Sequence, residues 1–322
     1  MRIANLVLRR SWPQGHRGRF VSVIILLAGG IFITYALVTN WNQLRTQGVE
    51  LDYKYAVLAL LLYPLGMLPT AAAWHTLLGS IGARKGFRVN LRIYSLSCLP
   101  RNVPGFVWFI ASRSLLYQEQ GVPASWIVAS SIAETLLLAF TGFATATLLA
   151  LSSNILLVES MGTVRVAPLI AIAVLLAVVA GAPFLDRIVH RLLPGQKTVD
   201  RAPPVSRTGM AFVLVWMLLA WCGGGVLLFI AAHIVMTPSW SALPTIIGIW
   251  GAAGAVSLTV GVGIQGIGIR EITLAALLST IMPPFAAAIL AILFRIILTA
   301  GELVWALFFA WLMGKSALGL RA

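Results

Sequence analysis

Seven ionisable residues lie in stretches that are otherwise apolar enough to cross a membrane. They are Arg101, Arg113, Glu134, Arg270, Glu271, Arg295 and Glu302. An ionisable side chain at the bilayer centre costs roughly 2.5–3.5 kcal/mol on insertion scales, so such residues usually face a cavity or one another. Two interpretations stay open: the residues bind a charged ligand, or they form structural ion pairs that hold helices together.

Arginines beside predicted helix breaks favour a binding site. Arg101 and Asn102 precede a break that includes Gly105, and Arg270 follows a glycine-rich stretch that ends at Gly268. Both patterns predict a helix N-terminus inside the membrane, where free N–H groups and the helix dipole attract anions. An adjacent guanidinium adds a bidentate donor that suits a phosphate.

Charged residues on the long helices extend this pattern. Arg295 and Glu302 are seven residues apart and so share a helix face, and Glu134 lies on another long helix. Glu271 would also stabilise the first turn of its helix without any ligand. We predict that these groups line a shared cavity. The candidate substrate-binding residues are Arg101, Asn102, Gly105, Trp108, Arg113, Glu134, Gly268, Arg270, Glu271, Arg295 and Glu302.

The composition excludes a soluble enzyme. Of the 322 residues, 60% are hydrophobic and 10% are charged, whereas a globular domain carries roughly 25% charged residues. The net charge of +14 indicates basic membrane loops and not a nucleic-acid-binding surface. We expect no metal, because the nine acidic residues and four histidines are scattered along the chain. We expect no nucleotide cofactor, because the glycine-rich stretch lacks the preceding strand that a GxGxxG loop requires. Most of the eleven tryptophans are expected to be interface anchors.

Apolar runs bounded by charge, Gly and Pro predict an all-α integral membrane protein. We expect about eight spanning helices and two short helices that are broken or re-entrant. Whether segments 89–118 and 242–281 span fully or re-enter stays open. The expected spans are residues 20–39, 53–79, 89–103, 123–152, 166–185, 208–236, 242–262 and 284–314, and the short helices are residues 105–118 and 268–281.

Basic residues assign the two sides of the membrane. Three lie in loops or loop edges expected on one side, namely Arg45, Lys54 and Arg165, and sixteen lie in segments expected on the other. This bias predicts cytoplasmic termini in a bacterial inner membrane. The sixteen are Arg2, Arg9, Arg10, Arg17, Arg19, Arg84, Lys85, Arg88, Arg92, Arg187, Arg191, Lys197, Arg201, Arg207, Lys315 and Arg321.

The side assignment implies two halves of opposite orientation, an arrangement typical of transporters. At an offset of 161 residues, Gly105 aligns with Gly266, Pro123 with Pro284, and Glu134 with Arg295. The predicted parts are a cytoplasmic basic arm at 1–19, a first membrane repeat at 20–152, a second repeat at 166–314 with a cytoplasmic loop at 186–207, and a cytoplasmic tail at 315–322.

Two segments carry motifs: Asn102-Val-Pro-Gly-Phe-Val-Trp108, followed by Arg113, and Gly266-Ile-Gly-Ile-Arg-Glu271. Both resemble segments of the lysylphosphatidylglycerol synthase transmembrane-region family. The chain departs from that family at Gln265, where Pro or Gly is usual. By this resemblance, the motif residues are Pro104, Gly105, Trp108, Arg113, Gly268, Arg270 and Glu271.

The resemblance implies a flippase-like domain, and we expect a stand-alone member without the aminoacyltransferase domain of the fused members. We therefore predict a transporter, not an enzyme, whose partner is a membrane lipid: an anionic phospholipid or a polyprenyl-phosphate-linked lipid. Two alternatives stay open, a membrane-embedded transferase acting on a lipid phosphate and a lipid-binding assembly subunit that transports nothing. Assembly into a homo-oligomer is also left open.

Overall fold

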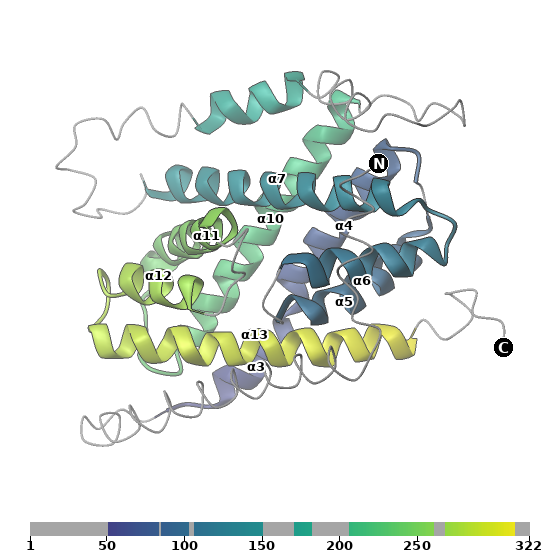
Figure 1. Ribbon diagram of the computed structural model, residues 1–322. Coiled ribbons are helices and arrows are strands. Elements are labelled where there is room, and N and C mark those ends of the chain that lie inside the picture. Colours follow the sequence, from purple (N-terminus) through teal and green to yellow (C-terminus); the bar gives the residue numbers. More distant parts are fainter. Residues whose placement is uncertain are drawn as a thin grey trace.

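The computed structural model describes residues 51–83, 85–102, 106–150, 171–181, 206–260 and 268–312. Within these residues the regular elements are helices and there is no strand (Figure 1). Five helices there are long and apolar enough to cross a membrane, so the chain is an all-α, multi-pass membrane protein. They are Lys54–Ser80, Ala124–Leu149, Arg207–Ala232, Trp240–Thr259 and Pro284–Phe309.

Two predicted spans lie wholly or to a considerable extent outside the described residues, and others lose only one or two terminal residues. The predicted helix 20–39 lies outside the described residues. The predicted helix 166–185 is described only in part, as a helix at Ala171–Gly181. The remaining elements divide into those before residue 151 and those after residue 205, which we call the first half and the second half.

Prolines punctuate the helices of the first half. The predicted helix 53–79 is divided at Tyr63, because Pro64 has no N–H to donate and instead begins a new helix. The elements are α3 (Lys54–Leu62), α4 (Pro64–Ser80), α5 (Phe87–Cys98), the 3-10 helix η1 (Leu99–Asn102), α6 (Phe106–Gln118) and α7 (Ala124–Ala150).

The segment at 89–103, for which a full span and a re-entrant helix were both left open, is divided into two elements up to residue 102. It is α5 followed by η1, because Pro100 cannot continue the α-helical hydrogen bonding. At 12 residues, α5 is about 18 Å long, which is short for a bilayer. Arg92, counted above among the loop residues, lies within α5 and is buried.

The second half follows the predicted helices closely. At the start of α10, the Ser206 hydroxyl accepts a hydrogen bond from the Gly209 N–H, which caps the helix. Pro284 begins α13, where its missing N–H costs nothing. The elements are α10 (Arg207–Ala232), the 3-10 helix η2 (Trp240–Ala242), α11 (Leu243–Val260), α12 (Ile269–Leu278) and α13 (Pro284–Leu312).

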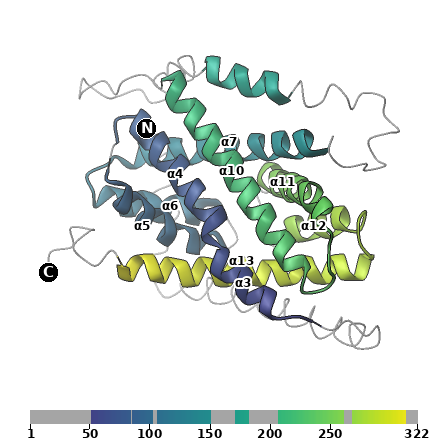
Figure 2. The ribbon, with the colours of Figure 1, turned by 180° about the vertical axis from the view of Figure 1, so that it is seen from behind.

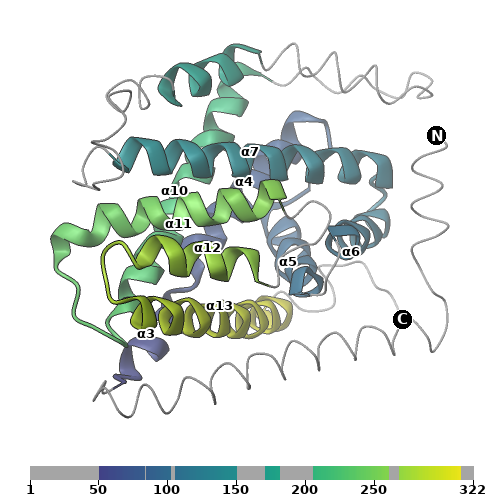
Figure 3. The ribbon, with the colours of Figure 1, turned by 60° about the vertical axis from the view of Figure 1, so that its left-hand side comes forward.

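Two crossed layers of helices form the described structure. Seen from behind, α10 lies side by side with α3 and α4, and these helices cross diagonally over α7 and α13 (Figure 2). Turned by 60°, the view shows α7, α11, α12 and α13 stacked in one layer, with α5 and α6 beside them (Figure 3).

The packing partners of the two halves correspond. Helix α7 packs on α11 as α13 packs on α5, and α6 packs on α7 as α12 packs on α13. Helices α7 and α13 run in opposite directions, and so do α4 and α10 (Figure 1). Two inverted repeats, in which α5 corresponds to α11, α6 to α12 and α7 to α13, would produce this pattern. The long helix α7 or α13 then packs on α11 or α5 of the other half, and each short helix packs on the long helix of its own half.

Three consecutive glycines on α10 allow its close contacts with α4 and α11. A Cβ atom on Gly223 would overlap the carbonyl oxygen of Leu65 in α4, and one on Gly225 would lie 2.6 Å from the Cα of Ile247 in α11. Gly224 faces the indole ring of Trp250. Small residues are common where membrane helices meet, because association there depends on close packing.

We expect Gly223→Ala to destabilise the protein by about 1–3 kcal/mol, because the added methyl group must push α10 away from α4. Gly79→Ala is the matched control, since a Cβ there meets nothing within 4 Å and alanine raises helix propensity. Thermal unfolding in detergent measures both. A Gly223 variant that melts at or above the wild-type temperature would contradict the proposed backbone contact.

Candidate functional site

A cavity of about 210 Å³ lies among the helices of both halves. Helices α4, α5, α6, α7, α10, α11, α12 and α13 each contribute at least one side chain to its wall. Most of that wall is aromatic or aliphatic, and a few polar groups interrupt it. The polar lining residues are Tyr63, Thr70, Tyr94, Glu134, Thr135, Trp221, Trp250, Ser257, Arg270, Arg295 and Glu302.

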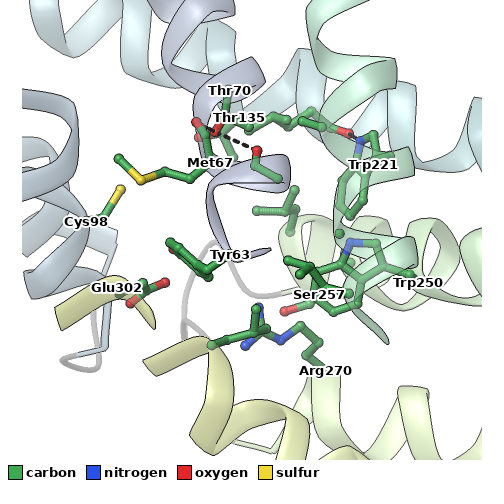
Figure 4. Close-up of a pocket in the computed structure, with 18 of the residues that line it drawn as sticks. Tyr63, Met67, Thr70, Cys98, Thr135, Trp221, Trp250, Ser257, Arg270 and Glu302 are labelled. Carbon is green, nitrogen blue, oxygen red and sulfur yellow. Dashed lines mark hydrogen bonds between the residues drawn. The ribbon is translucent and has the colours of Figure 1, made fainter. Parts of the chain in front are cut away.

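The polar groups approach the cavity from different sides. Arg270 and Glu302 lie on one side, and Thr135 lies on the opposite side, on α7 (Figure 4). Trp221 and Trp250 form the side wall of the cavity that runs from Thr135 to Arg270 (Figure 4). Two such rings beside a guanidinium make a pocket that is apolar in its body and charged at one end.

Glu271 organises the charged end. One of its carboxylate oxygens, Oε2, accepts a hydrogen bond of 3.0 Å from the Gly268 N–H. The other, Oε1, lies 3.4 Å from Arg295 Nη1 and 3.8 Å from Arg270 Nη2. Gly268 has a φ of +110°, a conformation that glycine adopts readily and other residues rarely do. This backbone geometry sets the start of α12 and thereby the position of Arg270.

Both arginines of this network remain accessible. The Arg270 side chain is 24% exposed and that of Arg295 is 19% exposed. The Arg270 guanidinium lies 5.5 Å from the centre of the Trp250 ring, within cation–π range. A ligand in the cavity can therefore reach both cations without first breaking a fully buried ion pair.

The first half has an ion pair of its own, and it is fully buried. Arg113 Nη1 on α6 donates to Glu134 Oε2 on α7 over 2.5 Å, and the two side chains are 0% and 2% exposed. Arg113 Nε also donates to the Ser97 hydroxyl of α5 over 3.1 Å. The pair thus fastens three helices together. Glu134 lines the cavity, whereas Arg113 does not.

Three aromatic rings enclose the Arg113 guanidinium. Its central carbon lies 4.2 Å from the ring centres of Trp74 and Phe109 and 4.5 Å from that of Tyr94. Cation–π attraction, at about 2 kcal/mol or more when desolvated, offsets part of the cost of burying this charge. Tyr117 fixes one ring, since its hydroxyl accepts a hydrogen bond of 2.8 Å from Trp74 Nε1.

The chain matches a known protein family over most of its length. The family model described as the lysylphosphatidylglycerol synthase TM region matches residues 20–306. The chain belongs to this family. Among curated proteins, no match is found. The resemblance noted in the two motif segments is therefore confirmed over most of the chain.

The residues that match the family motifs differ from one another in their surroundings. Arg270 lines the cavity, while Glu271 and Gly268 hold the network behind it. Arg113 is fixed in the aromatic cage, and Trp108 lies half-buried on α6, away from the cavity lining. Four predicted residues cannot be placed in this way. Pro104 and Gly105 lie outside the described residues, as do the side chains of Arg101 and Asn102.

The structure also corrects the expectation for several tryptophans. Trp74, Trp221 and Trp250 are 0%, 7% and 8% exposed, so they pack inside the protein and do not anchor it at the membrane interface. The sequence carried one relevant signal, the placement of Trp221 and Trp250 in the middle of long apolar helices. The sequence contained no signal for the three rings around Arg113, because they come from three separate helices, α4, α5 and α6.

We expect Arg113→Met to cost about 3–5 kcal/mol of stability, because it leaves the Glu134 carboxylate buried without its cation. The double variant Arg113→Met/Glu134→Leu should recover a large part of that loss, since neither charge remains. Unfolding in detergent of both single variants and the double variant measures the coupling. Arg88→Met, on the exposed start of α5, is the control. Additive losses in the double variant would argue against the pair.

Proposed function

We propose that this protein moves a phosphate-bearing lipid between the leaflets of the bacterial inner membrane. The observation that carries the proposal is the placement of Arg270 and Arg295 at a cavity shared by both halves. The family is named for the membrane region of a lipid-modifying enzyme, which agrees with a lipid ligand. An anionic phospholipid and a polyprenyl-phosphate-linked lipid both present the phosphate that this site requires.

A guanidinium suits this role because its planar N–H groups bind two phosphate oxygens at once. Arg270 and Arg295 are both partly exposed, so they supply the contacts to the headgroup. Arg113, with its side chain fully buried, acts by holding Glu134 in place. The aromatic and aliphatic wall would then contact the glycerol or first prenyl carbons, while the tails stay in the surrounding lipid.

Inverted repeats would provide the movement. Exchange of the conformations of two inverted halves opens a central site first to one leaflet and then to the other. The exchanged helix contacts described above support such repeats. The end of α4, followed by Lys85 and Arg88, lies near the start of α10 at Arg207 (Figure 2). Basic residues gathered at one end of the helices agree with cytoplasmic loops there.

We expect Arg270→Gln and Arg295→Gln each to slow lipid exchange by about tenfold or more, because each removes a charge-assisted contact to the phosphate. Reconstituted liposomes with a fluorescent phospholipid, quenched from outside, measure the exchange. Arg207→Gln is the control, since Arg207 is exposed at the start of α10. Native mass spectrometry should show a bound lipid that the two cavity variants lose.

Two results would overturn the proposal. One is wild-type protein that exchanges lipid no faster than protein-free liposomes. The other is cavity variants that exchange and bind lipid like wild type while keeping its melting temperature, since the arginines would then be structural.

A further inference from the structure

The formal charges of the described side chains in and beside the cavity cancel one another. Among the described side chains there are three arginines and three glutamates, so their formal charges sum to zero. They are Arg113, Arg270, Arg295, Glu134, Glu271 and Glu302. All belong to the two ion pairs or to the cavity wall itself.

Neutrality limits what this cavity can hold. A headgroup with one negative charge would leave that charge uncompensated in a site enclosed by apolar walls, where unpaired charges are costly. A headgroup that carries both a phosphate and a cation adds no net charge. It could still bind the arginines, provided that a carboxylate receives its cation.

Glu134 offers that carboxylate. Its side chain is 2% exposed and lines the cavity. Arg113 Nη1 binds its Oε2, whereas its Oε1 is buried and has no hydrogen-bond partner. A buried carboxylate oxygen without a donor is costly, so a ligand that supplies an N–H there gains binding energy. Arg113, held by its aromatic cage, keeps Glu134 from turning away.

We propose that the lipid headgroup is zwitterionic, with one phosphate diester bound by Arg270 and Arg295 and one primary ammonium that donates to Glu134 Oε1. This inference rests on the proposed function and names its substrate class. Glu134 and the two arginines line the same cavity, and Thr135, the residue after Glu134 on α7, lies across that cavity from Arg270 (Figure 4). Glu302 lies on the arginine side and completes the charge balance (Figure 4).

The ammonium must carry N–H groups. A trimethylammonium has none, so it would compensate the Glu134 charge and still leave Oε1 without a donor. The wild-type cavity should therefore prefer phosphoethanolamine lipids to phosphocholine lipids, and both to phosphoglycerol lipids, when all three have identical acyl chains.

Native mass spectrometry of the purified full chain, titrated with these three lipids, tests the order. We expect phosphoethanolamine to bind about tenfold or more tightly than phosphoglycerol. In Glu134→Gln the Arg113 contact can pass to the amide oxygen, while the cavity becomes net positive and loses its acceptor. The preference should then reverse, in favour of phosphoglycerol.

Glu302→Gln provides a second variant that leaves the Arg113–Glu134 pair intact. It also makes the cavity net positive, so phosphoglycerol should gain affinity relative to phosphoethanolamine, while the preference for primary ammonium over trimethylammonium should persist. A Glu134 variant that no longer folds therefore leaves the charge argument testable.

The inference fails if wild type binds phosphoglycerol as tightly as phosphoethanolamine, or if neither variant changes their ratio. That result leaves the proposed function standing as long as Arg270→Gln still weakens binding of every lipid. If Arg270→Gln weakens none of them, the proposed function itself fails, whatever the headgroup order.

Discussion

Charge compensation in a medium of low dielectric constant is the constraint on which this structure depends. Arg113 has no access to water, so its charge must be balanced by neighbours within a few ångströms. Glu134 supplies the opposite charge, and Trp74 is one of three aromatic rings that supply a further attraction. Because these groups come from α4 to α7, satisfying one cation fixes the arrangement of most of the first half.

The second half meets the same constraint with the charges exchanged. In the first half the short helix α6 carries the arginine and the long helix α7 the glutamate, whereas Glu271 lies on the short helix α12 and Arg295 on the long helix α13. The two pairs differ in burial: the side chains of Arg113 and Glu134 are 0% and 2% exposed, whereas those of Arg295 and Glu271 are both 19% exposed. The first pair is therefore suited to hold structure, and the second is placed where a ligand can compete for its cation.

Much of this organisation could be read from the sequence. Helix α7 begins one residue after its predicted start and α13 at its predicted start, because Pro123 and Pro284 are unambiguous signals. The offset that paired Glu134 with Arg295 joined the two residues that complete the ion pairs of the two halves. What the sequence could not show is which charges become accessible. That depends on long-range packing, as the wholly buried Arg113 and the partly exposed Arg270 demonstrate.

The shape of the cavity depends on a reciprocal fit between α10 and α11. Trp221 of α10 occupies the space left by Gly254 of α11, and Trp250 of α11 occupies the space left by Gly224 of α10. The two rings lie 6.1 Å apart, centre to centre, and both face the cavity. Each ring fits beside the glycine of the other helix. Sliding of one helix along the other would therefore move both rings away from the glycines that accommodate them. The two helices would then move as one unit. This unit is also fastened to α7, the helix of Glu134, because Trp221 Nε1 donates to the Leu138 carbonyl oxygen and to the Thr141 hydroxyl, each over 3.1 Å.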